Sequence, residues 1–377
     1  MLTAQITEPE SDGYPIILPT MILPSITKTF EMLNDLRQNP TTDPALLLRY
    51  RDRQYAAEML AVAIGKLNLF TWIDARGSVA TESIQQHFSL ARRPLDVLLT
   101  LCRAGGWIRT ESDRHELTAL GREHLVDHSP WFLGPYYAPI VDSPIAQGCL
   151  QVLQHDRPAN WQASEDGNDW HASMMDEAFA KGFTDLMNCR GTAMGQVLAD
   201  KTGSFLADCK HILDVGGGSG IYSSTLVAKH DHLRATVLEQ APVDRLTRDE
   251  IVRHGLQDRI DVVQGNMFTD PWPAVADCIL LSNVLHDWDV PEIRTLIQKT
   301  AAALPSGGRV IIHEAFLDDD KSGPLPVAEY SVLLVNITRG KCYCPAEYGE
   351  ILADSGFDVG PYQDTIADRG FITAIKR

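Results

Sequence analysis

A glycine-rich segment in the middle of the chain has the residue types of a ligand-binding turn. In LDVGGGSG, Asp214 closes a run of apolar residues, and Gly216, Gly218 and Gly220 follow at alternate positions before a helical stretch. Glycines at a strand-to-helix turn let the backbone approach a ligand closely, and the N-terminus of the next helix favours anionic groups. The segment therefore predicts a cofactor site at the end of a strand.

Two classes of cofactor use such a turn, and the neighbouring residues distinguish them. A dinucleotide fold has the spacing GxGxxG, whereas the spacing here is GxGxG. Asp214 precedes the glycines, where its carboxylate can pair with the ammonium group of an amino acid. Glu239 ends the next apolar run and can accept hydrogen bonds from two ribose hydroxyls, which both classes of cofactor provide. The position of Asp214 favours a cofactor that carries an amino acid, as S-adenosylmethionine does.

Composition argues against several other kinds of site. With 50 acidic and 33 basic residues, the chain has a formal net charge of -17. Such a charge repels polyanions, so we expect no nucleic-acid partner. The seven cysteines are scattered and odd in number, which is typical of reduced thiols rather than of a disulfide framework. No paired CxxC or HExxH spacing occurs, so we predict no metal site.

Neither a membrane span nor a secretory signal is expected. No window approaches the roughly eighteen uninterrupted apolar residues that a span needs. The N-terminal MLTAQITEPESDGYP lacks the basic start and the apolar stretch of a signal peptide. We therefore predict a cytoplasmic protein that acts on a small molecule.

The elements that must hold the glycine turn are short apolar runs separated by helical stretches. After Lys210 these runs are HILDVGGG, LRATVLEQ, RIDVVQGN, ADCILLSN and GRVIIHEAF. Such alternation predicts a parallel sheet that crossover helices bury on both faces. The closing segments FDVGPYQD and FITAIKR are expected to add an antiparallel hairpin at the sheet edge. The fold class is thus α/β, with a Rossmann-like sheet in residues 201–377.

The first half of the chain is predicted to be mainly helical. We interpret the proline-rich residues 1–45 as an irregular arm that docks on the body or on a second subunit. Residues 46–130 give helix, short helix, helix and two short strands, which is a winged-helix pattern. Because its third helix has no basic stripe, we favour a dimerisation module over DNA binding. Residues 131–200 are expected to be a helical linker that helps to form a pocket.

From about Ala56 to its end, the chain resembles the caffeic-acid and acetylserotonin type of O-methyltransferases. The most specific segment is LLSNVLHDWDVPEIRTLIQKTAAALPSGGRVIIHE. That family pairs an N-terminal winged-helix dimerisation domain with a Rossmann-like cofactor domain. The resemblance therefore implies this two-domain fold, S-adenosylmethionine as the cofactor, and a homodimer.

The resemblance also implies roles for a histidine and a glutamate. The histidine of the HDW tripeptide is the family's general base, which here is His286. A neutral imidazole, whose ordinary pKa is about 6.5, can take the proton of a phenol or enol as its oxygen attacks the methyl group. The first of two orienting glutamates falls on Glu314, which would hold one imidazole tautomer. Asp287 is expected to cap the next helix, and His313 to be structural.

At the second orienting glutamate, this chain departs from the family. The family's GKE or GQE triplet is GKC here, so Cys342 takes the place of the glutamate. A thiol, with an ordinary pKa of about 8.5, does not supply the charge of a carboxylate at pH 7. Either Glu314 suffices, or the acceptor is more acidic, or the chemistry differs. Arg339 is either a solvated surface arginine or a group that meets a carboxylate on the acceptor.

The resemblance extends to further cofactor contacts. The family's GDMF segment is GNMF here. Asn266 is therefore expected to accept a hydrogen bond from the adenine amino group, and Met267 to pack on the adenine ring. Ser282 stands where plant relatives often carry a lysine near the cofactor.

An acceptor pocket is predicted between two helical stretches. An apolar pocket lined by methionines suits an aromatic or polyketide-like acceptor. Its expected lining is Met174, Met175, Phe179 and Met187 on one side, and Leu333 and Ile337 on the other.

These residues predict O-methylation of a phenolic or enolic hydroxyl on a small aromatic or natural-product acceptor. Three alternatives stay open. C-methylation next to a phenol or enol would use the same deprotonation. A non-methylating enzyme, such as a pericyclase or a hydroxylase, would keep the cofactor only as structure or charge. A winged-helix regulator that senses S-adenosylmethionine would need DNA affinity, which the net charge disfavours.

Overall fold

The structure is a computed structural model that describes residues 35–158 and 174–377. Most of the predicted N-terminal arm, residues 1–34, lies outside the described residues. Within the described ranges, no helix combines the length and the apolar character that crossing a membrane requires.

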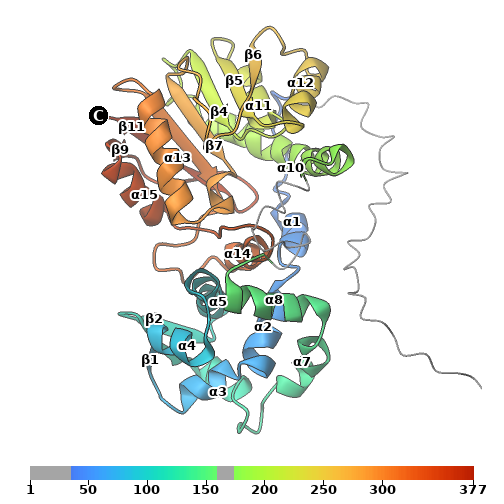
Figure 1. The fold of residues 1–377 in the computed structure, drawn as a ribbon, viewed down its shortest axis with the longest axis vertical. Helices are drawn as coiled ribbons and strands as arrows, with labels where there is room; N and C mark the ends of the chain where they lie inside the picture. The colour runs from blue at the N-terminus through green and yellow to red at the C-terminus, as the bar shows by residue number, and fades with distance from the viewer. Residues whose placement is uncertain (1–34, 159–173) are drawn as a thin grey trace, which may run out of the picture. The chain divides into compact units, whose positions relative to one another are not determined.

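A predominantly parallel sheet forms the C-terminal half of the chain (Figure 1). Its strand order is β10-β11-β8-β7-β4-β5-β6, and β9 also pairs with β11. The five strands from β4 to β8 pair in parallel, whereas β9, β10 and β11 pair antiparallel. The expected Rossmann-like sheet with an antiparallel addition at its edge is confirmed. The strands are β4 (His211–Val215), β5 (Arg234–Glu239), β6 (Ile260–Gln264), β7 (Cys278–Ser282), β8 (Arg309–Glu314), β9 (Phe357–Val359), β10 (Gln363–Asp364) and β11 (Gly370–Lys376).

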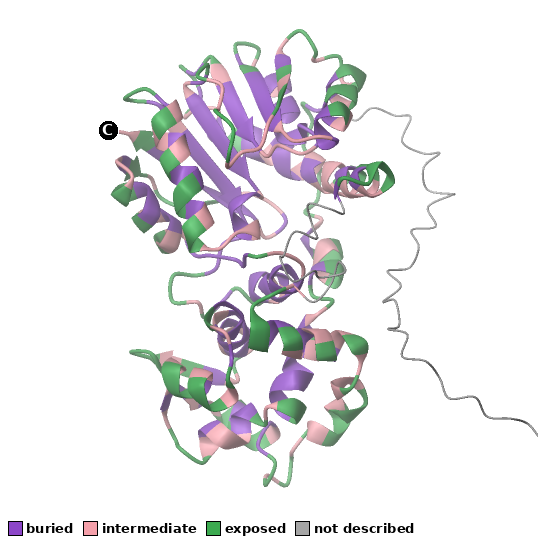
Figure 2. Cartoon of the chain, in the orientation of Figure 1, coloured by how far each residue is buried: buried purple, intermediate pink, exposed green. Residues whose placement is uncertain are grey.

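Helices cover both faces of this sheet because successive strand residues point to opposite sides. On β4, Ile212 packs into one apolar cluster and Leu213 into another. The first cluster lies under helices α10 (Glu177–Thr202), α11 (Ile221–Lys229) and α12 (Val243–Arg253). The second lies under α13 (Val290–Ala303) and α15 (Pro345–Asp354). The central strands are accordingly buried (Figure 2). Most residues of β6 are exposed or half-buried, because this strand lies at the edge of the sheet.

The N-terminal half is helical, with a small three-stranded sheet in the order β1-β3-β2. Helix α4, helix α5 and the hairpin β2–β3 follow one another in the order that the sequence predicts. The elements are α1 (Ala45–Asp52), α2 (Ala56–Ala61), a π-helical turn (Val62–Lys66), α3 (Leu69–Asp74), β1 (Val79–Ala80), α4 (Thr81–Phe88), α5 (Arg92–Ala104), β2 (Ile108–Glu111), β3 (Arg114–Leu117), α6 (Ala119–His124), α7 (Gly134–Val141) and α8 (Pro144–His155).

One helix of the C-terminal half packs into this helical region. Helix α14 (Leu325–Ile337) contacts α5, α2, α8 and α1. Its Val332 and Val335 belong to the same buried apolar cluster as α2, α3 and α5. The domain boundary predicted at residue 200 did not anticipate that a helix of the C-terminal half packs with the N-terminal helices. This packing brings the helical region next to the carboxyl end of the sheet.

Candidate active site

A cavity lies where the carboxyl ends of parallel strands meet α10 and α14. Its wall includes the glycine turn 216–219 after β4, Glu239 at the end of β5 and residues 282–284 and 286–288 after β7. Helices α10 and α14 contribute mainly apolar side chains. In open α/β sheets, ligands bind at this edge because the loops that leave parallel strands open a crevice there.

The glycine turn is shaped for close approach of a ligand. Gly216 and Gly218 have positive φ angles of 66° and 56°, which glycine adopts without strain. A Cβ on Gly216 would lie 3.6 Å from the sulfur of Met267, so a side chain there would enter the space between these residues. Both glycines and Met267 line the cavity, and their contacts with a cofactor stay a prediction.

Glu239 is fixed in place by the backbone around it. Its Oε2 accepts a hydrogen bond from the Gly218 N–H at 2.9 Å, and its Oε1 accepts one from the Gln240 N–H at 2.8 Å. Burial raises the pKa of this carboxyl group to about 7. A ligand that donates hydrogen bonds, such as a ribose diol, would favour its charged form. The carboxylate and the open turn beside it fit the ribose and the amino-acid portion of S-adenosylmethionine.

Asp214 does not line this cavity, contrary to the expected contact with an ammonium group. Its carboxyl lies beneath the turn, where a Cβ on Gly217 would come within 2.7 Å of it. Its Oδ2 accepts a hydrogen bond from the Ser223 hydroxyl at 2.7 Å, and burial raises its pKa to about 6. Asp214 thus stabilises the glycine turn by packing beneath Gly217, and its hydrogen bond to Ser223 connects the turn to α11.

Asn266 and Ser282 line the cavity, but each is already engaged in the protein. The Asn266 Oδ1 accepts a hydrogen bond from the Phe268 N–H at 2.8 Å. The Ser282 hydroxyl lies 2.9 Å from the Nδ1 of His313. The Thr269 N–H reaches the same oxygen of Asn266 at 3.4 Å, so the adenine contact predicted for Asn266 would have to replace this longer hydrogen bond. His313 is fully buried and holds Ser282, which agrees with its expected structural role.

His286 and Glu314 meet at the ends of β7 and β8. These parallel strands are paired with Ser282 opposite His313, so the turn after β7 lies next to the end of β8. The Nδ1 of His286 forms an ion pair with the Glu314 carboxylate. The Oε1 of Glu314 accepts hydrogen bonds from the N–H groups of Val284 and Leu285, each at 3.0 Å. Glu314 therefore fixes both the imidazole and the turn that carries it.

Opposing effects set the charge of the His286 imidazole. Burial is the largest single effect and lowers its pKa, but the negative charge of Glu314 together with Tyr330 and Asp287 outweighs it, and the net pKa is raised to about 9. On the other side of the ring, the Asp287 carboxylate lies 3.6 Å from Nε2. Burial raises the pKa of Asp287 to about 6. His286 lines the cavity, so its ring can exchange a proton with a bound molecule there.

The sequence had indicated that Asp287 caps the next helix, but this prediction is wrong. The N-cap of α13 is Asp289, whose Oδ1 accepts a hydrogen bond from the Val290 N–H at 2.8 Å. Asp287 instead lines the cavity. Two aspartates stand two residues apart in this segment, and only the conformation of the turn decides which one caps the helix.

The segment around Gly340 supports His286 from behind. A Cβ on Gly340 would come impossibly close to the carbonyl oxygen of His286, so only glycine fits there. The Arg93 side chain of α5 donates a hydrogen bond to the Gly340 carbonyl at 2.5 Å. Cys342, at the position of the family's second glutamate, is buried off the cavity and donates its N–H to the Ser331 hydroxyl. Among the described residues, Glu314 is the carboxylate that contacts the Nδ1 of His286.

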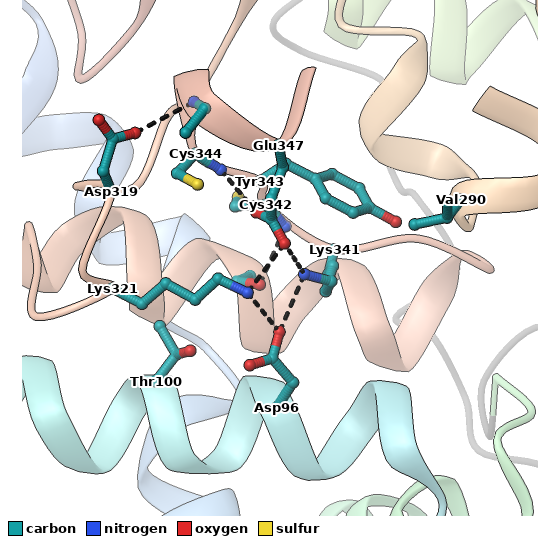
Figure 3. A network of polar contacts seen from close by, with 12 residues as sticks. Asp96, Thr100, Val290, Asp319, Lys321, Lys341, Cys342, Tyr343, Cys344 and Glu347 are labelled. Atoms are coloured by element: carbon teal, nitrogen blue, oxygen red, sulfur yellow. Dashed lines mark hydrogen bonds and ion pairs between the residues drawn. The ribbon is translucent and has the colours of Figure 1, made fainter. Parts of the chain in front are cut away.

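A network of charged groups connects this segment to the helical region (Figure 3). The Asp96 carboxylate of α5 lies 2.9 Å from the Lys341 ammonium and 3.0 Å from that of Lys321. Both lysines also contact Glu347 of α15. The two lysines hold the pKa of Asp96 well below its usual range, although burial opposes this. Helix α5 thus helps to hold the backbone on which His286 rests.

The predicted acceptor-binding residues are only partly brought together. Met187, Leu333 and Ile337 line the cavity, as does Met174. Met175 does not, because it lies in the turn before α10 and is 65% exposed. Phe179 does not either, because it lies in the first turn of α10 and packs on a cluster of Met174, Ala180 and Val243.

Several cavity residues were not among the predicted acceptor-binding residues. Phe183 and Arg190 of α10 lie one turn on either side of Met187, so helical spacing from that residue could have indicated them. Tyr330 of α14 packs edge-on against the His286 ring at 5.8 Å. Arg51 of α1 comes from the helical region and has no local sequence signal. Arg339, considered earlier for an acidic acceptor, is exposed and does not line the cavity.

Comparison with known proteins gives a consistent group of relatives. A family model described as an O-methyltransferase domain matches residues 150–358. The 3-hydroxy-5-methyl-1-naphthoate 3-O-methyltransferase of Streptomyces sahachiroi is 33% identical over 316 residues, which cover 83% of this chain and 89% of that protein. The L-tyrosine C(3)-methyltransferase of Streptomyces lavendulae is 28% identical, over 79% of this chain and 82% of that protein. An O-methyltransferase family 2 protein from Planctomyces limnophilus, solved in complex with apigenin, has a TM-score of 0.81 and 28% identity, over 92% of this chain and 99% of that one.

Proposed function

Since the chain belongs to the O-methyltransferase family and is an S-adenosylmethionine-dependent methyltransferase, we propose that it methylates a phenolic or enolic hydroxyl with His286 as the general base. The observation that carries this proposal is the setting of His286. Its Nδ1 is paired with a buried carboxylate, and its ring lies on the wall of the cavity. That arrangement leaves Nε2 as the nitrogen that can accept a proton from a bound hydroxyl.

In the proposed reaction, different residues of the cavity bind the cofactor, accept the proton and orient the acceptor. Gly216, Gly218, Glu239 and Met267 would hold the cofactor, which supplies the methyl group when it is bound. His286 accepts the hydroxyl proton at Nε2, and Glu314 stabilises the resulting imidazolium and keeps the proton on Nδ1 in the neutral ring. The cavity walls orient the acceptor, and correct orientation contributes much of the rate of a displacement reaction.

A small aromatic compound is the acceptor that the cavity favours. Met187, Leu333 and Ile337 present apolar surface, and Phe183 and Tyr330 add aromatic rings. Such walls match the flat apolar faces of an aromatic ring, and His286 supplies the polar contact that fixes the hydroxyl. Relatives named for naphthoate and tyrosine substrates support this class of acceptor.

Analysis of the product tests the proposal directly. We expect incubation with S-adenosylmethionine and a panel of hydroxynaphthoates and flavonoids to yield S-adenosylhomocysteine and a product heavier by one methylene. In the carbon NMR spectrum, the new carbon should resonate as a methoxy group. Methylation on carbon would contradict the proposed O-acceptor but would agree with the second candidate.

That second candidate is C-methylation next to a phenol or enol. It is favoured by the similarity to an L-tyrosine C(3)-methyltransferase and by the presence of Cys342 at the second glutamate position. Removal of the same proton by His286 makes the adjacent ring carbon nucleophilic. In that case the NMR spectrum would show an aryl-methyl carbon instead of a methoxy carbon.

We also propose that the protein is a homodimer and that its winged-helix-like region is the dimerisation module. Large apolar side chains on that half of the chain face solvent: Leu47 is 77% exposed and Tyr136 is 82% exposed. Exposed apolar surface of this kind is typical of an interface with another protein. Sedimentation equilibrium should return twice the mass of the chain. A monomer mass at micromolar concentration would contradict this proposal.

A further inference from the structure

Arg190 is a cation on the cavity wall that has only weak partners among the described residues. Its Nη1 lies 3.4 Å from the Tyr330 hydroxyl, and its Nη2 lies 3.3 Å from the sulfur of Met187. Its Nε is buried and has no hydrogen-bond partner there. The charge of Asp52 acts on Arg190 without forming an ion pair with it. A guanidinium has five N–H donors, and here only a hydroxyl and a thioether lie within reach of them.

A bound anion would stabilise Arg190 in its surroundings. A buried charge is costly unless it is paired, so an enclosed guanidinium is stable only when something compensates it. A second guanidinium, that of Arg369, lies 4.3 Å from the centre of the Tyr330 ring, but it is ion-paired with Asp52 and does not compensate Arg190. Two acidic groups on the cavity wall, Glu239 and Asp287, repel an anion. The other two cations there are already paired, Arg51 with Asp52 and His286 with Glu314. An anion that enters the cavity is therefore directed toward Arg190.

The shape and location of Arg190 narrow the choice of anion. The planar fork of a guanidinium matches the two oxygens of a carboxylate. Helix α10 is held against the glycine turn at this level, because the Ser219 hydroxyl donates to Asn188 and a Cβ on Gly191 would lie 2.5 Å from Ile221. On its other side, Arg190 reaches Tyr330, which packs against His286. Arg190 therefore stands between the cofactor side and the acceptor side of the cavity.

We propose that Arg190 is the carboxylate-binding group of this cavity. The proposal rests on the proposed function for the identity of the two ligands. Either of them can supply the carboxylate: the amino-acid end of the cofactor, or an acidic aromatic acceptor.

Calorimetric titration of Arg190→Met tests this proposal and separates the two sources. The cofactor probes are S-adenosylhomocysteine and 5′-methylthioadenosine, which lacks the amino-acid carboxylate. The acceptor probes are 3-hydroxy-2-naphthoate and 2-naphthol, which differ by the carboxylate. Loss of a bidentate, charge-assisted pair should weaken the carboxylate-bearing ligand by about tenfold or more and leave its neutral counterpart unchanged. If Arg190→Met binds S-adenosylhomocysteine more weakly but 5′-methylthioadenosine as before, the carboxylate belongs to the cofactor. If it binds 3-hydroxy-2-naphthoate more weakly but 2-naphthol as before, the carboxylate belongs to the acceptor.

Two further variants make the result decisive. Arg190→Lys keeps the charge but loses the fork, so its affinity should lie between those of the wild type and Arg190→Met. This variant also serves if the methionine variant does not fold. Arg51→Met is the matched control, because Arg51 lines the same cavity but is ion-paired with Asp52. Equal affinities of wild type and both Arg190 variants for all four ligands would overturn the proposal. These measurements involve no methyl transfer, so they can fail or succeed independently of the product analysis.

Discussion

Replacing His286 by alanine is expected to lower kcat by about a hundredfold or more while leaving the affinity for S-adenosylhomocysteine unchanged. The imidazole lines the cavity and is paired with the buried Glu314 carboxylate, and its removal leaves the acceptor hydroxyl protonated. The residues that would hold the cofactor lie on the glycine turn and on β5, and they do not depend on this side chain. Steady-state kinetics and calorimetric titration of the same preparation measure both quantities.

His230→Ala is the matched control for this prediction. His230 is half-buried, contacts the carbonyl of Ala199 and does not line the cavity. It should retain the kcat of the wild type. Undiminished kcat in His286→Ala would exclude His286 as the base. If the alanine variant also lost cofactor affinity, His286→Gln would fill the volume of the ring and should restore binding but not turnover.

The pairing of His286 with Glu314 could be predicted because the family resemblance implied it. The family motif places both residues just beyond strands that are adjacent and parallel, and the observed register puts the two loops side by side. Side-chain direction was harder to predict. Asp214 was expected to face a ligand, but its carboxyl lies under Gly217 and is bonded to Ser223. A strand end can place a side chain above or below the turn, and the sequence does not distinguish these directions.

The acceptor side of the cavity depended on tertiary contacts that no local pattern reports. Apolar residues on α10 repeat at helical spacing, but where the helix begins decides which of them reach the cavity. Asp176 caps α10, so Met175 lies in a turn and Phe179 lies beyond the cavity. Arg51 and Tyr330 reach the cavity because α1 and α14 pack together across the predicted domain boundary. Residues brought together from such distant segments could not be assigned from spacing alone.

Glu314→Gln is expected to lower kcat by about 10²-fold or more, because it changes the tautomer of His286 with little change of shape. The glutamine Oε1 can still accept the hydrogen bonds from Val284 and Leu285, so the turn should be preserved. Its amide NH₂ would donate to Nδ1, which moves the ring proton to Nε2. A ring that carries its proton on Nε2 cannot accept one there from the acceptor.

The pH profile distinguishes this effect from a general loss of structure. A general base must be unprotonated, and the pKa of His286 is raised to about 9 mainly by the charge of Glu314, against the effect of burial. For the wild type, kcat/KM should therefore rise with pH through a midpoint near pH 9 and level off above it. In Glu314→Gln the attraction for the imidazolium is lost while burial remains, so the midpoint should move to lower pH and the plateau should be lower. Glu347→Gln removes a carboxylate away from the cavity and should leave the midpoint unchanged. An unshifted midpoint in Glu314→Gln would show that Glu314 does not control the protonation of His286, and its role would then be confined to holding the backbone of the turn.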